Sequence, residues 1–266
     1  MTVRITSRNA RFQQWESLLH NRTKRRRLGE LVVQGVRPIS VAIEHGWTIR
    51  ALISDGRPRM SSWAAGVWGT TDAERVVMAP ELVAELGEKD EPSELLAIVG
   101  MPADDLTRLD PTGLTVVFDR PTQPGNIGTL ARSSDAFGAT GLVVTGHAAD
   151  PYDPRAVRAS TGSLFALTVV RAPSHREVLD WARLAGVRVV GTDETGTTDL
   201  RAANLTGPLL VVVGNETSGM TAAWREACDE LVSIPMAGSA SSLNAATAGS
   251  IVLDEAARQR RGLDRA

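Results

Sequence analysis

The sequence predicts an α/β fold with a parallel sheet in its second half, and three observations carry this prediction. Short, continuously apolar runs rich in β-branched residues recur after residue 113. Helix-like segments separate several of these runs, as in parallel sheets covered on both faces. Hydrophobic residues make up 42% of the 266 residues and aromatic residues only 4%, so we expect a core of Val, Leu, Ala and Ile.

The first half alternates strand and helix candidates and predicts a smaller α/β domain over residues 1–105. The expected helices are 11–20, 40–45 and 80–86, and the expected strands are 30–34, 49–54 and 75–78. The first helix is justified by Phe12, Trp15, Leu18 and Leu19 at helical spacing. The polar stretch around 106–112, which is flanked and interrupted by proline, predicts a linker.

The second half, residues 113–266, is predicted as the parallel-sheet domain. The expected strands are 114–118, 142–145, 167–170, 187–190, 209–213 and 231–234. The expected helices are 127–137, 174–184, 221–230 and 244–260.

Charge and cysteine usage exclude several classes of protein. The formal net charge is −2, but Met1 to Arg27 holds eight basic residues against one acid, a local charge of 8 − 1 = +7. Cys228 is the single cysteine, which excludes an intrachain disulfide and fits a reducing cytoplasm. No apolar signal region or run of ~18 apolar residues is present, and the histidines are scattered. We expect a cytoplasmic protein without membrane segment or metal site.

Two turns of small and polar residues follow predicted strands. In the first, Asn126 is expected as a helix N-cap, with Arg132 about a turn and a half later. In the second, Glu216 stands between Gly214 and Gly219 after the most apolar strand. Ligands of open α/β sheets bind beyond the carboxyl ends of strands. The alternatives are a plain loop with a surface arginine for the first turn and a helix cap for Glu216.

A third turn is the most informative. The strand ending at Ser233–Met236 runs into a loop of small residues, which runs into a helix with Asn244 near its start. Small residues let backbone groups approach a ligand, and a helix start leaves N–H groups unpaired. The sequence therefore predicts a ligand site built by three turns. A fourth loop carries Arg155 and Arg158, which either hold phosphates or form a solvated face.

Together, the three turns resemble the SpoU (TrmH-like) family of RNA ribose 2'-O-methyltransferases, in the SPOUT superfamily. The matching residues are Asn126, Gly128 and Arg132 in the first motif, Gly214, Glu216 and Gly219 in the second, and Ser233–Met236 with Ser242–Asn244 in the third. The first half is similar to the substrate-binding domain of that family through Gly29–Pro38.

The resemblance implies a deep trefoil knot in residues 113–266, a homodimer, S-adenosylmethionine as cofactor and no metal. It implies that cofactor-binding residues are Gly214, Asn215, Ile234, Met236, Ser242, Leu243 and Asn244. The catalytic residues that it implies are Arg132, Asn126, Glu216, Ser242 and Asn244. It further implies methylation of a uridine ribose in 23S rRNA and resistance to a ribosome-targeting antibiotic. The alternatives are a tRNA ribose methyltransferase of the same superfamily and a non-catalytic rRNA-binding protein.

The family assigns a base-like role to the arginine that matches Arg132. A guanidinium keeps its proton at neutral pH and has no acceptor atom, so we favour a role in fixing a phosphate over a role as proton acceptor. For RNA binding we expect contacts from the basic run Arg25, Arg26 and Arg27, with Arg155 and Arg158 as further contacts.

Overall fold

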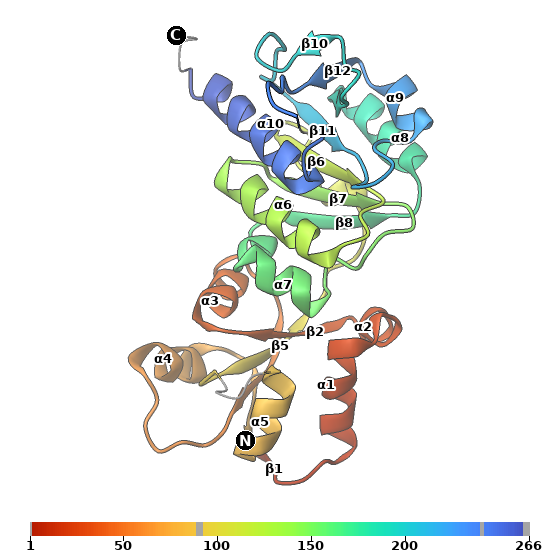
Figure 1. Cartoon of the computed structure of the whole chain (residues 1–266). Helices are drawn as coiled ribbons and strands as arrows, with labels where there is room; N and C mark the ends of the chain where they lie inside the picture. Colours follow the sequence, from red (N-terminus) through yellow and green to blue (C-terminus); the bar gives the residue numbers. More distant parts are fainter. Residues whose placement is uncertain (1, 89–92, 240–241, 263–266) are drawn as a thin grey trace. The chain divides into compact units, whose positions relative to one another are not determined.

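The computed structural model describes residues 2–88, 93–239 and 242–262 of the chain. Its contacts divide the chain into two compact units (Figure 1). The first unit is Met1–Pro102 with Tyr152–Val157, and the second is Ala103–Pro151 with Arg158–Ala266. The short stretch Tyr152–Val157 thus belongs to the first unit although it lies far along the chain, which no local sequence pattern indicated.

The segment predicted as a linker packs as part of the second unit. Leu106–Arg108 form a 3-10 helix, η1, and Leu109 is 3% exposed within the apolar core of that unit. The physical reason is the pair of leucines in an otherwise polar stretch, since burying a leucine stabilises a fold by about 1.5–3 kcal/mol. The domain bounds 1–105 and 113–266 stay a prediction.

The first unit is a mixed sheet with helices on both faces, which agrees with the predicted α/β class. The strand order is β1-β4-β3-β5-β2, and β5 runs antiparallel to β2 and β3. In chain order the elements are β1 (Thr2–Ile5), α1 (Ala10–His20), α2 (Arg22–Leu28), β2 (Glu30–Gln34), α3 (Val36–Glu44), β3 (Ile49–Ser54), α4 (Ser62–Thr70), β4 (Glu74–Met78), α5 (Pro80–Gly87) and β5 (Leu96–Gly100). Of these, β1, α2, α4 and β5 were not predicted.

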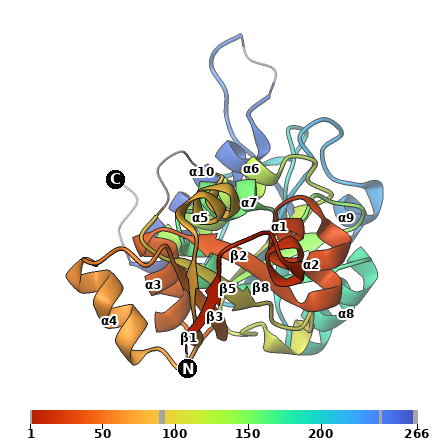
Figure 2. The same cartoon turned by 90° about the horizontal axis from the view of Figure 1, so that it is seen from below.

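Both faces of this sheet are covered. Ala51 and Ile53 of β3 pack in one core cluster with α1 and α5, while Leu52 between them is fully buried on the opposite face. Figure 2 shows α3 and α4 on that opposite side. The indole N–H of Trp63 on α4 donates to Ser40 Oγ on α3 at 2.9 Å, which joins these two helices. Within β3 the run Ala51–Ile53 is continuously apolar, as expected where a strand is buried on both faces, and this run made the strand recognisable in the sequence.

The second unit is a seven-stranded sheet whose described strand pairs are all parallel, so the predicted parallel sheet is confirmed. The strand order is β10-β12-β9-β11-β6-β7-β8. The elements from η1 onward are β6 (Leu114–Asp119), α6 (Pro124–Ala136), β7 (Gly141–Thr145), α7 (Pro154–Ser160), η2 (Ser163–Phe165), β8 (Thr168–Ala172), α8 (His175–Ala185), β9 (Arg188–Thr192), β10 (Thr198–Asp199), β11 (Leu209–Val213), α9 (Ala222–Ala227), β12 (Glu230–Ser233) and α10 (Ala245–Arg260). Of these, α7 is divided between the units, because its residues up to Val157 belong to the first unit. Every strand and helix predicted for this half is present: β11 has the predicted bounds, and the others have shifted ends.

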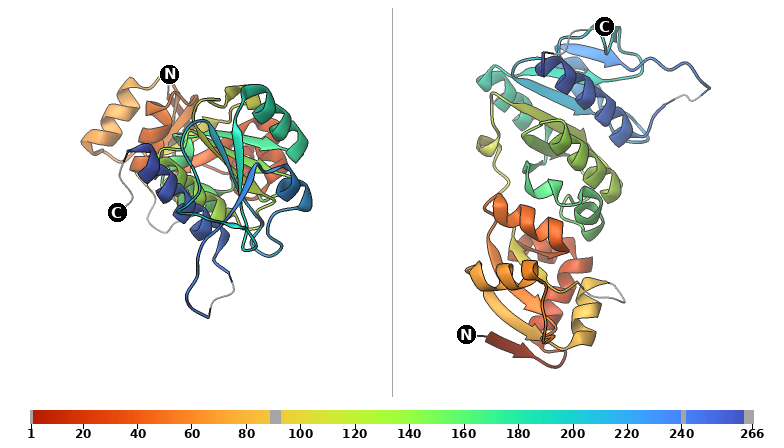
Figure 3. Two further views of the ribbon diagram at one scale, coloured as in Figure 1. Left: turned by 90° about the horizontal axis from the view of Figure 1, so that it is seen from above. Right: turned by 90° about the vertical axis from the view of Figure 1, so that its left-hand side faces the viewer.

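Helices cover both faces of this sheet: α6 and α10 lie on one face and α8 and α9 on the other (Figure 3). Leu210 and Val212 of β11 share a core cluster with Trp224 of α9. On the opposite face, a Cβ added to Gly249 of α10 would stand 2.6 Å from Leu130 of α6 and 3.1 Å from Val213. The close approach of α10 to α6 therefore depends on the missing side chain at position 249.

The chain crosses the sheet edge between β12 and α10. β12 pairs with β9, whereas α10 packs against α6 and β11. The chain therefore leaves the sheet beside β9, at the end of β12, and enters α10 beside β11. The deep trefoil knot expected from the resemblance stays a prediction.

Candidate active site

The turns after β6 and β11 are tied to each other by hydrogen bonds. The two strands are parallel neighbours, so their carboxyl ends meet at the same edge of the sheet. Asp119, at the end of β6, is 3% exposed and accepts a hydrogen bond from the Thr221 N–H at 3.1 Å. The side-chain amide of Asn215 donates to the Arg120 carbonyl at 2.7 Å. These bonds hold the loop after β11 next to the start of the loop after β6.

The loop after β11 is a tight turn at the end of the strand. The backbone groups of Asn215 and Gly219 hydrogen-bond each other in both directions at 3.0 Å. Gly219 has a φ of +63°, a conformation that favours glycine. A Cβ added to Gly214 would stand 2.4 Å from the Met220 nitrogen, so this position has room for glycine alone.

The Glu216 carboxylate accepts hydrogen bonds from groups at the amino end of α6. These donors are the Thr122 N–H (3.1 Å), the Gln123 N–H (3.4 Å) and the Asn126 side-chain amide (2.9 Å). The alternative that Glu216 caps the helix near Thr221 is wrong, because Thr221 itself caps α9. The amino end of a helix carries a partial positive charge, which stabilises a carboxylate there.

Opposing effects act on the pKa of the Glu216 carboxyl. Partial burial raises this pKa, whereas the hydrogen bonds from Asn126 and from nearby backbone N–H groups lower it, and the lowering is larger. The carboxylate is therefore ionised at neutral pH and acts there as an acceptor alone.

A chain of hydrogen bonds joins one residue from each of the three predicted turns. Asn126 Nδ2 donates to Glu216 Oε1 at 2.9 Å, and Asn126 Oδ1 accepts from Asn244 Nδ2 at 3.2 Å. Asn244 is the N-cap of α10 and accepts from the Thr247 N–H at 3.2 Å. The prediction of Asn126 as an N-cap is wrong: α6 starts at Pro124, a residue favoured at the first helical position, which places Asn126 inside the helix.

Arg132 lies on α6 too, but among the described residues it takes no part in this chain of hydrogen bonds. Its side chain is exposed, and Nη1 donates a long hydrogen bond to Thr161 Oγ1 at 3.4 Å. Thr161, with a φ of +53°, belongs to the turn between α7 and η2. An exposed guanidinium is accessible to an RNA phosphate, and the catalytic role of Arg132 stays a prediction.

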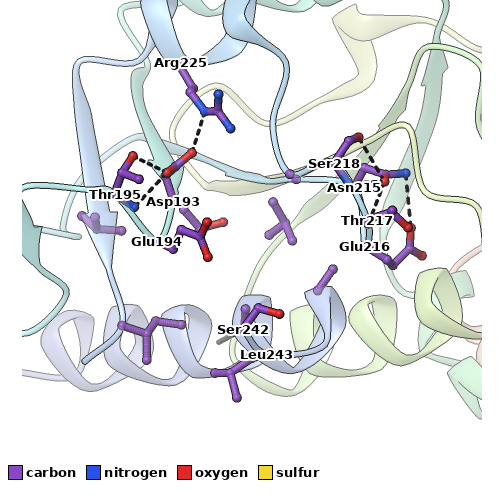
Figure 4. Close-up of a pocket in the computed structure, with 18 of the residues that line it drawn as sticks. Asp193, Glu194, Thr195, Asn215, Glu216, Thr217, Ser218, Arg225, Ser242 and Leu243 are labelled. Carbon is purple, nitrogen blue, oxygen red and sulfur yellow. Dashed lines mark hydrogen bonds and ion pairs between the residues drawn. The ribbon is translucent and has the colours of Figure 1, made fainter. Parts of the chain in front are cut away.

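A cavity of about 520 Å³ lies beside Glu216 (Figure 4). This volume falls within the range of small-molecule sites. Its walls include most of the residues predicted to bind the cofactor, namely Gly214, Asn215, Ile234, Met236, Ser242 and Leu243. Asn244, the remaining one, is flanked by the lining residues Leu243 and Ala245. The structure therefore gathers the predicted cofactor residues at one cavity, and their binding roles stay predictions.

One wall of this cavity was not predicted from the sequence. Asp193, Glu194 and Thr195 line it from the loop after β9, and Arg225 lines it from α9. A signal was present, because Gly191–Gly196 is a polar turn between glycines directly after an apolar strand. Figure 4 shows Asp193 between Arg225 and Thr195, across the cavity from Asn215.

Arg25, predicted as an RNA contact, is buried. The residue is 2% exposed, and Nη1 donates to the carbonyls of Leu18 (2.6 Å) and Leu19 (3.3 Å). These carbonyls belong to the last turn of α1 and lack partners within the helix. Arg25 Nη2 also lies 3.9 Å from Asp153 Oδ2. Since this guanidinium fastens α2 to the end of α1 and does not face solvent, the predicted RNA contact at Arg25 is wrong.

The other predicted RNA contacts, Arg26, Arg27, Arg155 and Arg158, are exposed. Arg155 Nε lies 3.0 Å from Asp153 Oδ1, the carboxylate that also faces the buried Arg25. The first unit thus brings two distant basic stretches to one carboxylate. Their binding to RNA stays a prediction.

Among residues 2–88, 93–239 and 242–262, no helix is long and apolar enough to span a bilayer, and no three His, Cys, Asp or Glu side chains gather as metal ligands. Burial raises the pKa of the Cys228 thiol to about 12, so this group is protonated at neutral pH and a poor nucleophile.

Two family descriptions match the chain. The SpoU rRNA Methylase family matches residues 113–254, and the SpoU L30e-like domain matches residues 9–97. The 23S rRNA (uridine(2479)-2'-O)-methyltransferase of Streptomyces viridochromogenes is 58% identical over 265 residues, which cover 97% of this chain and 92% of that protein.

Solved structures that match nearly all of this chain are also similar. The SpoU methyltransferase AviRb from Streptomyces viridochromogenes, in complex with the cofactor AdoMet, is 57% identical with a TM-score of 0.90, over 97% of this chain and 100% of that one. An AdoMet-bound rRNA methyltransferase from Sinorhizobium meliloti is 29% identical with a TM-score of 0.87, over 99% of both chains.

Proposed function

The chain belongs to the SpoU rRNA methylase family, and we propose that it transfers a methyl group from S-adenosylmethionine to a ribose 2'-hydroxyl of 23S rRNA. Membership makes it an S-adenosylmethionine-dependent RNA 2'-O-methyltransferase; the 23S rRNA and a uridine as the methylated nucleotide are the proposed part. The observation that carries the proposal is the hydrogen-bond chain from Glu216 through Asn126 to Asn244, beside the cavity.

The residues around the cavity fit S-adenosylmethionine. Val213, Ile234 and Leu243 offer apolar surface for an adenine ring, and the turn at Gly214 brings backbone N–H and C=O groups to the wall. Acidic side chains on the same walls suit a ligand with a sulfonium and an ammonium group. Small-molecule sites commonly combine such an apolar lining with a few placed polar groups.

S-adenosylmethionine supplies a methyl group on a sulfonium, which is already a good leaving group. The protein must then mainly hold the ribose 2'-oxygen in line and help its proton depart. Glu216 fixes the amide of Asn126, and Asn126 fixes that of Asn244, so these amides are oriented before the RNA arrives. Ser242 adds a hydroxyl on the cavity wall.

For Arg132 we propose a positioning role. Its exposed guanidinium binds a phosphate next to the target ribose, and the proton of the 2'-hydroxyl leaves to a phosphate oxygen or water. Direct proton acceptance by Arg132 is the competing account, which is disfavoured because a guanidinium offers no acceptor atom.

Recognition of the RNA by the first unit completes the proposal. Arg26, Arg27 and Arg155 contact phosphates from that unit, and Arg158 does so from the second. A homodimer with a knotted second unit, a cytoplasmic location and resistance to a ribosome-targeting antibiotic also belong to the proposal, on the strength of the resemblance. The relative that matches 97% of the chain is named for uridine methylation in 23S rRNA, which favours this substrate over tRNA.

The test is to map 2'-O-methylation on 23S rRNA and on total tRNA, each incubated with the protein and S-adenosylmethionine. We expect one new methylated uridine in 23S rRNA and none in tRNA. Methylation of tRNA instead would establish the alternative substrate. RNA binding without methylation of either RNA would establish a non-catalytic binding protein.

A further inference from the structure

We propose that Arg225 binds the α-carboxylate of S-adenosylmethionine and that Asp193 is the residue which positions it. The inference rests on the proposed function, since it assigns one end of the cofactor within the same cavity. Both residues line the cavity from parts of the chain that none of the three matched motifs includes: the loop after β9 and helix α9.

Asp193 is fully used by protein donors. Its Oδ1 accepts hydrogen bonds from the Thr195 N–H (2.9 Å) and the Thr195 hydroxyl (2.6 Å), and its Oδ2 accepts from Arg225 Nε at 2.6 Å. The Asp193 side chain is 5% exposed. Burial raises the pKa of this carboxyl, but the Thr195 and Arg225 contacts outweigh burial and lower it. Asp193 is therefore ionised, and both of its carboxylate oxygens already accept hydrogen bonds from the protein. It affects a ligand by orienting Arg225.

The Arg225 guanidinium is fixed through Nε, and its Nη1 and Nη2 atoms are available to a ligand. The bond from Nε to Asp193 fixes the plane of the guanidinium, whose side chain stays 44% exposed. Within the described residues, Nη1 and Nη2 donate no hydrogen bond, although a guanidinium carries five N–H groups in total. A planar, pre-oriented fork of this kind suits a carboxylate, which it can bind through two parallel hydrogen bonds.

The charges of the cavity wall identify the ligand group. Arg225 is the basic side chain among the described lining residues, whereas Asp193, Glu194 and Glu216 are acidic. Among the described lining residues, Arg225 alone offers an anionic group a charge of opposite sign. S-adenosylmethionine carries one anionic group, its α-carboxylate. An RNA phosphate is the competing occupant and becomes an outcome of the test.

The experiment compares two neutral-sulfur ligands on the full-length protein by titration calorimetry. S-adenosylhomocysteine keeps the amino acid end, and 5'-methylthioadenosine lacks it while keeping the adenosine and the thioether. We expect Arg225→Gln to weaken S-adenosylhomocysteine about 10–100-fold, as for loss of a charge-assisted pair, and to leave 5'-methylthioadenosine within about twofold. Asp193→Asn should weaken S-adenosylhomocysteine relative to 5'-methylthioadenosine by about 3–10-fold, because the Arg225 guanidinium loses the carboxylate that orients it.

Arg183→Gln is the matched control. Arg183 forms an exposed ion pair with Asp180 on α8 at 3.0 Å and does not line the cavity. We expect both ligands to bind this variant as they bind the wild type. Retained 5'-methylthioadenosine binding by Arg225→Gln shows that the variant is folded and the cavity intact.

Three outcomes would overturn the proposal. Equal weakening of both ligands would make Arg225 a structural residue, and no change in either would remove it from cofactor binding. Unchanged ligand affinity with weaker RNA binding would assign the guanidinium to a phosphate. Failure of the wild type to bind S-adenosylhomocysteine at all is a different result, because it would contradict the proposed function itself.

Discussion

The two units hold their functional polar groups in different ways. In the second unit, Asn126, Glu216 and Asn244 come from three turns and fix one another within hydrogen-bond distance. In the first unit, Arg26 and Arg27 stand exposed on the surface of α2. Chemistry on one atom needs groups placed within about 0.5 Å, whereas attraction of a polyanion acts over a Debye length of about 8–10 Å. Substitutions in the second unit should therefore affect methyl transfer, whereas substitutions in the first unit should affect the strength and salt dependence of RNA binding.

Arg25 shows that this difference depends on burial and not on residue type. It stands next to Arg26 in the sequence, yet its guanidinium is enclosed by carbonyls of α1. Replacing Arg25 would leave those carbonyls unpaired and perturb the fold of the first unit, so it is unsuitable as a probe of RNA contacts.

The largest expected effect comes from Arg132→Ala in the second unit. We expect methyl transfer to fall at least about 100-fold, as when a group that stabilises a transition state is removed. Affinity for S-adenosylhomocysteine should stay within a few-fold, because Arg132 is proposed to serve the RNA. Single-turnover methylation and calorimetry measure the two quantities. A folded variant that lost cofactor binding would contradict the proposed role.

Two fragments of the second unit sharpen the comparison of the units. A fragment of residues 103–266 keeps Leu109, which is 3% exposed in the core, whereas 113–266 lacks it. We expect the shorter fragment to be less stable by about 2–5 kcal/mol, the usual cost of removing a buried leucine side chain. Urea denaturation measures the difference. Equal stability would show that the segment contributes nothing to this unit.

The longer fragment should also bind S-adenosylhomocysteine, because every lining residue of the cavity lies in the second unit. Absence of binding by a folded 103–266 fragment would show that the first unit is needed for the cofactor.

Glu216→Gln tests the hydrogen bonds that pre-orient Asn126 and Asn244, and it should destabilise the fold less than loss of the segment that carries Leu109. At pH 7 we expect a loss of roughly 1 kcal/mol in the free energy of unfolding. The folded pKa of Glu216 is lowered, so its stabilisation is present above its unfolded pKa of about 4.3 and is lost as pH falls through the folded value. The stability difference between wild type and variant should therefore shrink below about pH 4. A difference that is constant with pH would mean that the ionised carboxylate is not what stabilises α6.

The smallest effect is expected from replacing Arg26 and Arg27 together with Gln. Each lost phosphate contact should reduce the slope of log affinity against log salt by about 0.7–0.9. Affinity for S-adenosylhomocysteine should not change, because both residues lie in the first unit. Filter binding of a 23S rRNA fragment at several salt concentrations measures the slope. An unchanged slope would move RNA recognition to Arg155 and Arg158.

The sequence by itself determined the fold class, six of the seven strands of the parallel sheet and the turns that contribute part of the cavity wall. Continuous apolar runs such as Leu209–Val213 mark a strand buried on both faces, and small polar turns after them mark a sheet edge where ligands bind. Such signals are local, so they survive without knowledge of the rest of the chain. The predicted trefoil knot and dimer rest on resemblance, because neither has a local signal.

The tertiary structure decided which groups meet. Nothing near Glu216 in the sequence shows that its carboxylate serves the start of α6, and nothing near Arg25 shows that the end of α1 and Asp153 enclose it. The same holds for the pair of Arg225 and Asp193 on the missed cavity wall. Burial and hydrogen-bond partners depend on distances between segments far apart in the chain, which residue type and spacing do not encode.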